Sequence, residues 1–403
     1  MERVNVNGIS VILDKVQGNS VVVLARIKVG SIYENEKIAG ISHFTEHMVF
    51  EGTKKRSSTE ISNAIEKLGG EINAFTDYGK TVFYVKIAKK HIENALDILS
   101  DIVKNPVFEK KSFEKEKRVV VDEVNMVFDD PKMYQWWFML RNLFDKNPVR
   151  NPIYGKKEVI LNMSRNTLLD FYNKYYTKQN LEIIVVGNFN KNNTVHLIKR
   201  YFKDVKSGKE SKRDNILEKP LKKQRMNSEK RKINQSYMMV GFRTVPRKDK
   251  DSYVFDVINA ILCRGQSSKL FEEIRTKRGL AYVLGSYLEA GTDYGFLGIY
   301  VASNLKNLDK IKEIIFNEIE KLKNISDEDL KKAKDYQEGT YLLEMEEKEK
   351  RGTIIASWSL SDSLEELRKY ISYIKKVNSK DIRRVLSKYM NKENSAIITI
   401  KQA

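Results

Sequence analysis

The stretch Tyr84-Val85-Lys86-Ile87-Ala88 leads into a helical pattern that starts at His91. A similar stretch, Tyr300-Val301-Ala302-Ser303, leads into a helical pattern that starts at Leu308. The two stretches are about 216 residues apart, close to half of the 403-residue chain. We therefore predict a duplicated α+β fold with two similar lobes, each a mainly antiparallel sheet covered by helices.

Runs rich in valine and isoleucine, bounded by turn residues, mark the expected strands. In the first lobe, residues 9–16 and 21–29 are expected to form a hairpin through Gly18-Asn19, and residues 71–76 and 81–88 a second one. The remaining expected elements are a strand at 181–186 and helices at 40–50, 59–68, 91–103 and 112–128. The second lobe repeats this order, with strands at 236–242, 282–289 and 295–302 and helices at 252–262, 269–278 and 308–322.

A basic segment separates the two halves. Residues 203–232 hold 12 basic and 5 acidic residues, few large apolar side chains, and the turn-forming Gly208 and Pro220. This composition is typical of an interdomain linker. We predict a linker at residues 208–232, between a first lobe at 1–207 and a second at 233–403.

The net charge of +19 invites a nucleic-acid or anionic-membrane partner. However, lysines interleave with acidic residues along most of the chain, and no zinc-finger, RRM or KH signature is present. The longest apolar run, residues 21–27, contains Arg26 and falls far short of the ~18 residues that span a bilayer. We therefore expect a globular protein that binds neither nucleic acid nor membrane.

Cysteine content and the N-terminal sequence bear on the compartment. Cys263 is the single cysteine, so an intramolecular disulfide is excluded. The first residues lack the apolar stretch of a signal peptide. We expect a cytoplasmic protein.

Two of the four histidines fall in His43-Phe44-Thr45-Glu46-His47. Positions i and i+4 of a helix share one face, so both imidazoles can reach one ion. Glu46 is placed to meet a water on that metal rather than the metal itself. This is the H-x-x-E-H arrangement, and its two imidazoles plus a carboxylate suit Zn²⁺ with one position left for water.

A third ligand is expected from the helix at 112–128, which holds Glu114, Glu116, Asp122 and Glu123. Glu116 and Glu123 are seven residues apart, so two helical turns place both carboxylates on one face. Spacing alone does not choose among these acids.

The motif, with Glu123 following 76 residues after His47, resembles the pitrilysin-like inverzincins, in particular the short-chain type related to mitochondrial processing peptidase. The resemblance covers nearly the whole chain. It implies a zinc metalloendopeptidase with one Zn²⁺ per chain held by His43, His47 and Glu123. It further implies Glu46 as general base and Glu116 as a supporting catalytic acid.

Two further segments match the family. Asn73-Ala74-Phe75-Thr76 resembles its edge strand, to which substrate adds as an extra strand and where Asn73 and Ala74 would bind it. Arg275 and Tyr282, seven residues apart, resemble the pair that binds substrate and stabilises the oxyanion. The family places this pair in the second lobe, which here lacks the metal motif, since Asn259 and Cys263 fall near the positions of the histidines.

The leading hypothesis is a zinc-dependent endopeptidase that hydrolyses peptides or unfolded protein segments. The alternative is a non-catalytic structural or assembly subunit of the same fold. Long members of the family enclose substrate between two halves, and this chain is about half their length while carrying both sets of residues. The resemblance therefore implies a homodimer, with a heterodimer containing an inactive homologue as the second possibility.

Overall fold

The computed structural model describes all residues from Met1 to Ala403. The chain divides into two compact units, and each unit takes residues from both halves of the sequence. Unit 1 comprises Met1–Met126, Asn151–Asp214 and Glu344–Leu360, and unit 2 comprises Val127–Arg150, Asn215–Leu343 and Ser361–Ala403. The predicted lobes, 1–207 and 233–403, differ from these units by the two exchanged segments.

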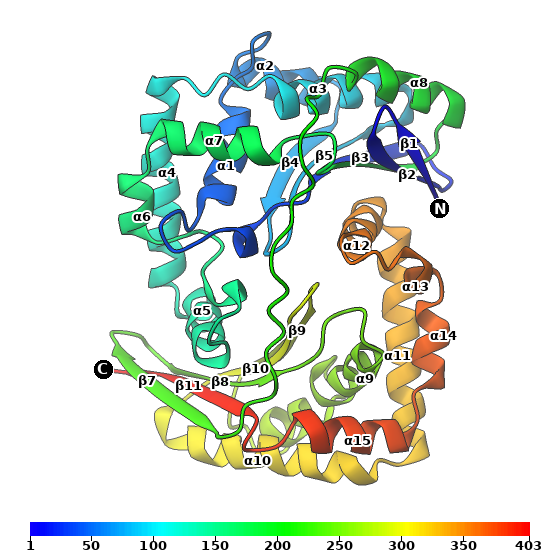
Figure 1. Ribbon diagram of the computed structural model, residues 1–403. Helices are drawn as coiled ribbons and strands as arrows, with labels where there is room; N and C mark the ends of the chain where they lie inside the picture. The colour runs from blue at the N-terminus through cyan, green and yellow to red at the C-terminus, as the bar shows by residue number, and fades with distance from the viewer. The chain divides into compact units, whose positions relative to one another are not determined.

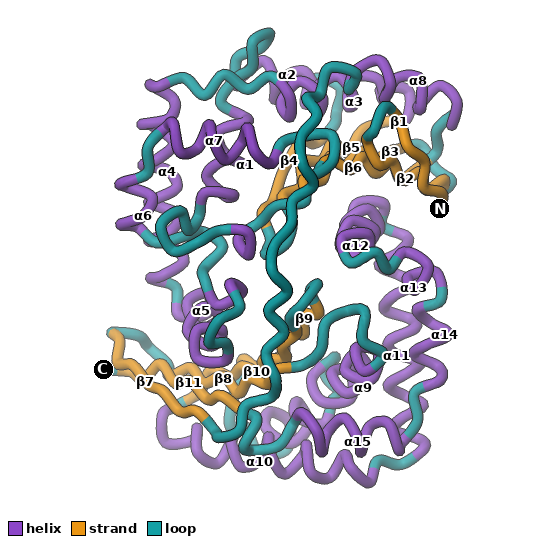
Figure 2. Tube along the Cα trace, in the orientation of Figure 1, coloured by secondary structure: helices purple, strands orange, loops and turns teal.

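Unit 1 is built on a six-stranded sheet in the order β1-β2-β6-β3-β5-β4 (Figure 2). Its strands are β1 (Glu2–Val6), β2 (Ile9–Lys15), β3 (Ser20–Ile27), β4 (Glu71–Thr76), β5 (Thr81–Ala88) and β6 (Leu181–Gly187). Only β2 and β6 pair in parallel, and all other neighbours are antiparallel. The predicted mainly antiparallel sheet is confirmed, and β4 is an edge strand.

The predicted hairpin between residues 9–16 and 21–29 is wrong, because β6 lies between β2 and β3. The alternate residues Val21, Val23, Ala25 and Ile27 of β3 belong to the main core, while Leu24 meets a helix on the opposite face. A strand covered on both faces is apolar throughout, so its pattern cannot tell which strand is its neighbour.

Unit 2 is built on a five-stranded sheet in the order β7-β11-β8-β10-β9. Its strands are β7 (Arg225–Arg231), β8 (Ser236–Arg243), β9 (Val283–Ala290), β10 (Gly295–Ser303) and β11 (Ser395–Gln402). The β7–β11 pair is parallel and the others are antiparallel. The order and directions match β2-β6-β3-β5-β4 of unit 1, so the predicted duplication is confirmed.

Strand β7 corrects the predicted linker at 208–232. Residues 202–224 contain neither helix nor strand, but Arg225–Arg231 pairs with β11. This strand was not predicted because it lies at an edge of the sheet and is mostly polar, so it lacks the apolar run that marked the other strands. Charged residues on an edge strand are usual, since they oppose pairing with other chains.

The helices are α1 (Ile41–Phe50), α2 (Ser58–Glu66), α3 (Ile92–Lys104), α4 (Lys110–Asp129), α5 (Pro131–Leu143), α6 (Lys157–Asn162), α7 (Arg165–Tyr175), α8 (Lys191–Tyr201), α9 (Asp251–Cys263), α10 (Leu308–Lys321), α11 (Asp327–Glu346), α12 (Lys348–Leu360), α13 (Leu364–Arg368), α14 (Tyr370–Lys376) and α15 (Ser379–Tyr389). Six of the predicted helices are confirmed, by α1, α2, α3, α4, α9 and α10, and the structure adds further helices to them. Within the helix predicted at 269–278, the segment Phe271–Thr276 is π-helical. None of the helices is both long and apolar enough to cross a lipid bilayer.

Each half of the sequence contributes one helix to the unit that the other half mainly builds: α5 belongs to unit 2 and α12 to unit 1. In Figure 1, α12 lies beside the strands of unit 1, and α5 lies beside those of unit 2. Gly352 of α12 packs directly on Leu24 of β3. In unit 2 the small residues are on the sheet instead, where Gly241 and Gly298 face Met139 and Trp136 of α5. A larger residue at any of these glycines would push the helix off its sheet.

Candidate metal centre

The start of α1 is fixed by a buried carboxylate. Glu34 accepts hydrogen bonds from the backbone N–H groups of Gly40 (2.6 Å) and Ser42 (2.8 Å). These are among the N–H groups that a helix leaves without partners, and Gly40 has no side chain to cap them. A Cβ on Gly40 would lie 2.7 Å from Gly155 Cα, so only glycine allows this close approach.

One face of α1 belongs to the core and orients the other. Phe44 and Met48 are fully buried, and the Phe44 ring stacks on Phe113 of α4 at 5.1 Å. This contact holds α4 alongside α1. His43 and His47 lie one turn apart, with ring centroids 4.7 Å apart, and Glu123 approaches both from α4.

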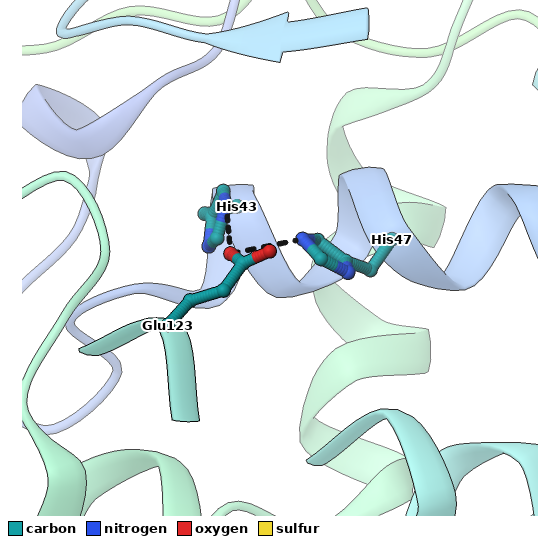
Figure 3. Close-up of side chains that lie close together, drawn as sticks. All are labelled: His43, His47 and Glu123. Carbon is teal, nitrogen blue, oxygen red and sulfur yellow. Dashed lines mark ion pairs between the residues drawn. The ribbon is translucent and has the colours of Figure 1, made fainter. Parts of the chain in front are cut away.

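His43, His47 and Glu123 place one ligand atom each within 4.8 Å of one another (Figure 3). Glu123 Oε2 lies 3.3 Å from His43 Nε2 and 3.4 Å from His47 Nε2. Ligands that sit ~2.1 Å from a tetrahedral ion are about 3.4 Å apart. The nitrogen and oxygen donors therefore fit zinc, and of the four candidate acids named from the sequence it is Glu123 that joins the histidines.

Glu116 lies behind the cluster rather than in it. His47 Nδ1 donates to Glu116 Oε2 at 3.3 Å, which leaves Nε2 free to face Glu123. Lys115 binds the other oxygen of Glu116 at 3.1 Å. A carboxylate that holds the second nitrogen of a histidine in this way orients the ring and raises its basicity toward a metal.

The electrostatics of the cluster suit a cation. Burial lowers the pKa of His43 to about 4, so its imidazole is neutral at pH 7. Burial also acts against the charged form of His47, but its hydrogen bonds to Glu116 and Glu123 outweigh this and raise its pKa to about 9. The hydrogen bond from His47 in turn lowers the pKa of Glu123. In the absence of a metal, His47 therefore holds a proton between Glu116 and Glu123, and a bound dication would displace that proton.

Glu46 lies beside the cluster, and its carboxylate points to the sheet. Its Oε2 accepts a hydrogen bond from Thr76 Oγ1 at 2.5 Å. Burial raises the pKa of Glu46 to about 7. A half-buried carboxylate next to the metal ligands has the position and the basicity expected of a general base.

The predicted substrate strand is β4, which has one open edge. Asn73 is exposed, and its side-chain oxygen accepts the N–H of Ala74 at 2.8 Å. Strand β4 ends at Thr76, so the open edge runs up to the general base. This placement agrees with a strand that receives an extended peptide.

Arg275 and Tyr282 belong to unit 2, whereas the metal cluster belongs to unit 1. The Arg275 guanidinium lies 4.4 Å from the centroid of the Tyr282 ring. Tyr282 is 75% exposed, the largest exposed fraction among the large apolar side chains. Their part in substrate binding stays a prediction.

Two residues that shape the site could not be predicted from the sequence. Glu34 fixes the start of α1, but it precedes the helix by several residues in an irregular segment. Tyr154 packs edge-to-face on His43 at 4.9 Å from a loop more than 100 residues away. Neither residue has a spacing to the motif that a sequence pattern could use.

Comparisons with known proteins identify the family. Residues 10–157 match Insulinase (Peptidase family M16), and residues 162–336 match Peptidase M16 inactive domain. An uncharacterized zinc protease of Rickettsia felis is 31% identical over 331 residues, covering 81% of this chain and 79% of that protein. An uncharacterized zinc protease of Bacillus subtilis is 30% identical over 344 residues, covering 84% and 83%.

The fold comparison agrees. A crystal structure of a protease from Helicobacter pylori superimposes with a TM-score of 0.94 over 99% of both chains, at 23% sequence identity. The two-lobed fold and the site define a metallopeptidase scaffold. The chain belongs to peptidase family M16, the pitrilysin-like family.

Proposed function

We propose that the protein is a zinc-dependent endopeptidase acting on peptides or unfolded protein segments. The observation that carries this proposal is the convergence of His43, His47 and Glu123 on one point, with Glu46 beside them. The names of the relatives, zinc proteases at about 30% identity, support it.

His43, His47 and Glu123 would hold the metal, and Glu116 would orient His47. When bound, zinc supplies a Lewis acid that polarises a carbonyl and lowers the pKa of a water toward 7. Glu46 takes a proton from the attacking water and returns it to the leaving amine.

The substrate would add to the open edge of β4 as an extra strand. Backbone hydrogen bonds along such an edge bind any sequence in extended form, so unfolded segments are favoured over folded ones. Asn73 and Ala74 are the residues proposed to hold it, near the end of the strand that meets Glu46.

We further propose a homodimer in which each active site combines the metal cluster of one chain with the partner subunit's Arg275 and the partner subunit's Tyr282. The Tyr hydroxyl would stabilise the oxyanion. The exposure of Tyr282 and the stacked guanidinium of Arg275 support this role. A two-fold axis would give two equal sites.

The second candidate is a non-catalytic subunit. The observation that favours it is the match of residues 162–336 to a domain described as inactive. The intact motif in residues 10–157 favours the enzyme. Metal analysis separates the two, because one zinc per chain is expected for the enzyme.

The decisive test is digestion of a peptide library with and without chelator, read by mass spectrometry. We expect cleavage that chelation stops and zinc restores, and that is absent from the Glu46→Gln variant at full zinc occupancy. A protein that binds no zinc and cleaves no peptide would favour the structural subunit.

A further inference from the structure

Glu46 depends on a single hydrogen bond from the protein. Its carboxylate is held by Thr76 Oγ1 at 2.5 Å, and no other group donates to it. A glutamate side chain has several rotatable bonds, and its carboxylate swings freely unless a donor fixes it. The hydroxyl of Thr76 is therefore the group that decides where the Glu46 oxygens point.

The place of Thr76 in the fold makes this donor rigid. Side chains alternate along a strand, so Ile72, Ala74 and Thr76 share one face of β4, and Ile72 and Ala74 pack on the core on that face. Thr76 pairs with Thr81 of β5. The turn that follows is closed by the Asp77 N–H, which donates to the Lys80 carbonyl at 2.8 Å.

The turn is anchored as well. The backbone N–H of Ile32 donates to the carbonyl of Tyr78 at 2.9 Å. Lys80 is buried and pairs with Asp77 at 2.6 Å. The hydroxyl of Thr76 thus projects from a strand end that is fixed on both sides.

We propose that Thr76 is a positioning residue, which orients the Glu46 carboxylate and fixes the edge strand β4 to the helix that carries the metal ligands. This inference rests on the proposed function, since it assigns the support of its general base. The same strand would receive the substrate. One hydrogen bond therefore sets the distance from the general base to the edge where the scissile bond would lie. Proton transfer requires that this distance be held accurately.

The test compares Thr76→Val, which keeps the shape and removes the donor, with Thr76→Ser, which keeps the donor. In zinc-loaded protein we expect Thr76→Val to lower kcat about 10- to 100-fold, the scale of one hydrogen bond to a charged group. KM and zinc content should stay near wild type, and Thr76→Ser should restore most of kcat.

A matched control is Thr45→Val. Thr45 is buried on α1 next to Glu46, but its hydroxyl donates at 2.7 Å to the Ile41 carbonyl of its own helix, a bond that can be lost at little cost. This variant should keep kcat within about two-fold, since it leaves the Glu46 contact intact.

A second readout needs neither zinc nor activity. In metal-free protein, hydrogen–deuterium exchange of residues 71–76 should be faster in Thr76→Val than in wild type, and unchanged in Thr45→Val. The positioning role is overturned if zinc-loaded Thr76→Val keeps wild-type kcat, or if Thr76→Ser loses as much as Thr76→Val. Both results presuppose a wild type that cleaves peptides and a Glu46→Gln variant that does not, so they are distinct from failure of the proposed function itself.

Discussion

Helices α1 and α9 follow corresponding strands of the two units, yet the polar side chains of the two helices differ in their hydrogen-bond partners. In α9, Asp256 accepts from Arg247 at 2.9 Å and from Tyr370 at 3.1 Å, and Asn259 accepts from Ser286 at 2.5 Å. Burial raises the pKa of Cys263 to about 12, so its thiol stays neutral and is a poor ligand. In unit 2, hydrogen bonds within the unit satisfy these groups.

In α1, by contrast, the two histidines each direct one ring nitrogen toward the same point. His43 Nδ1 is buried without a partner, and its Nε2 and that of His47 both face Glu123. The comparison teaches that a duplicated fold supplies two helices in the same place, while the side chains decide which helix can bind a metal.

Each sheet also holds a buried arginine on the face that the exchanged helix covers, and the partners of these two arginines differ. Arg26 of β3 pairs with Glu182 at 2.7 Å, and both side chains are buried. Arg243 of β8 is also buried, and it has two partners. Glu218 lies at 2.8 Å and is 10% exposed, whereas Asp145 lies at 3.0 Å, is 54% exposed and is held by Arg225 as well. Glu218 differs from Glu182 in that it also accepts hydrogen bonds from three backbone N–H groups, those of Asp145, Lys146 and Asn147.

The largest effect is expected from Arg26→Met. It removes the buried cation that pairs with Glu182 and leaves this carboxylate only the hydroxyls of Ser10 and Ser359 and the more distant Arg3 at 3.4 Å. We expect a cost of up to about 3–5 kcal/mol of unfolding free energy. Arg243→Met should cost less, because Asp145 stays exposed and paired with Arg225, and three backbone N–H groups continue to bind Glu218. Urea unfolding of both variants checks this, and equal losses would contradict the comparison.

The cost of Arg26→Met should depend on pH. Burial acts to raise the pKa of Glu182, but Arg26 and the hydrogen bonds from Ser359 and Ser10 outweigh burial and lower it. A lowered folded-state pKa contributes stability above the unfolded value of ~4.5, and this is lost as the pH falls. The deficit of Arg26→Met should therefore shrink in acid.

The next largest effect is expected from Glu46→Gln. The amide cannot accept a proton from water, so hydrolysis should fall at least ~10²-fold while zinc and fold are kept. Peptide turnover and metal content measured on the same sample check this. Turnover near wild type, with contamination excluded, would refute the proposed general base.

Two isosteric substitutions distinguish a residue that binds the metal directly from one that only orients a metal ligand. Glu123→Gln should lower zinc occupancy sharply, since it replaces a charged ligand. Glu116→Gln keeps an acceptor for His47 Nδ1, and we expect a loss of zinc affinity of only about 10-fold, the lower range for such supporting groups. Zinc titration with a competing chelator measures both, and the reverse order would reverse the assignment.

The smallest signal is expected from mixing two inactive variants. Glu46→Gln and Tyr282→Phe should each be poor at hydrolysis. In a mixed homodimer one site collects both lesions and the other none, so random exchange restores about a quarter of wild-type activity. If the subunits demonstrably exchange and no activity returns, the sites do not form across chains.

The sequence determined the elements that depend on local periodicity and on chemistry with fixed spacing. Helix α1 and its pair of histidines follow from a 3.6-residue repeat, and the strands follow from apolar runs. The sequence also indicated the duplication, because two related segments carry the same order of elements. The choice of Glu123 over its neighbours came from the family resemblance, since all four acids lie on one helix.

Only the tertiary structure decided what depends on contacts between distant residues. Strand β6 enters between β2 and β3 because sheet neighbours are chosen by packing across the whole unit, which a local pattern does not encode. The exchange of α5 and α12, the cap from Glu34 and the bond from Thr76 to Glu46 are decided in the same way. Each joins residues whose separation along the chain bears no relation to their separation in space.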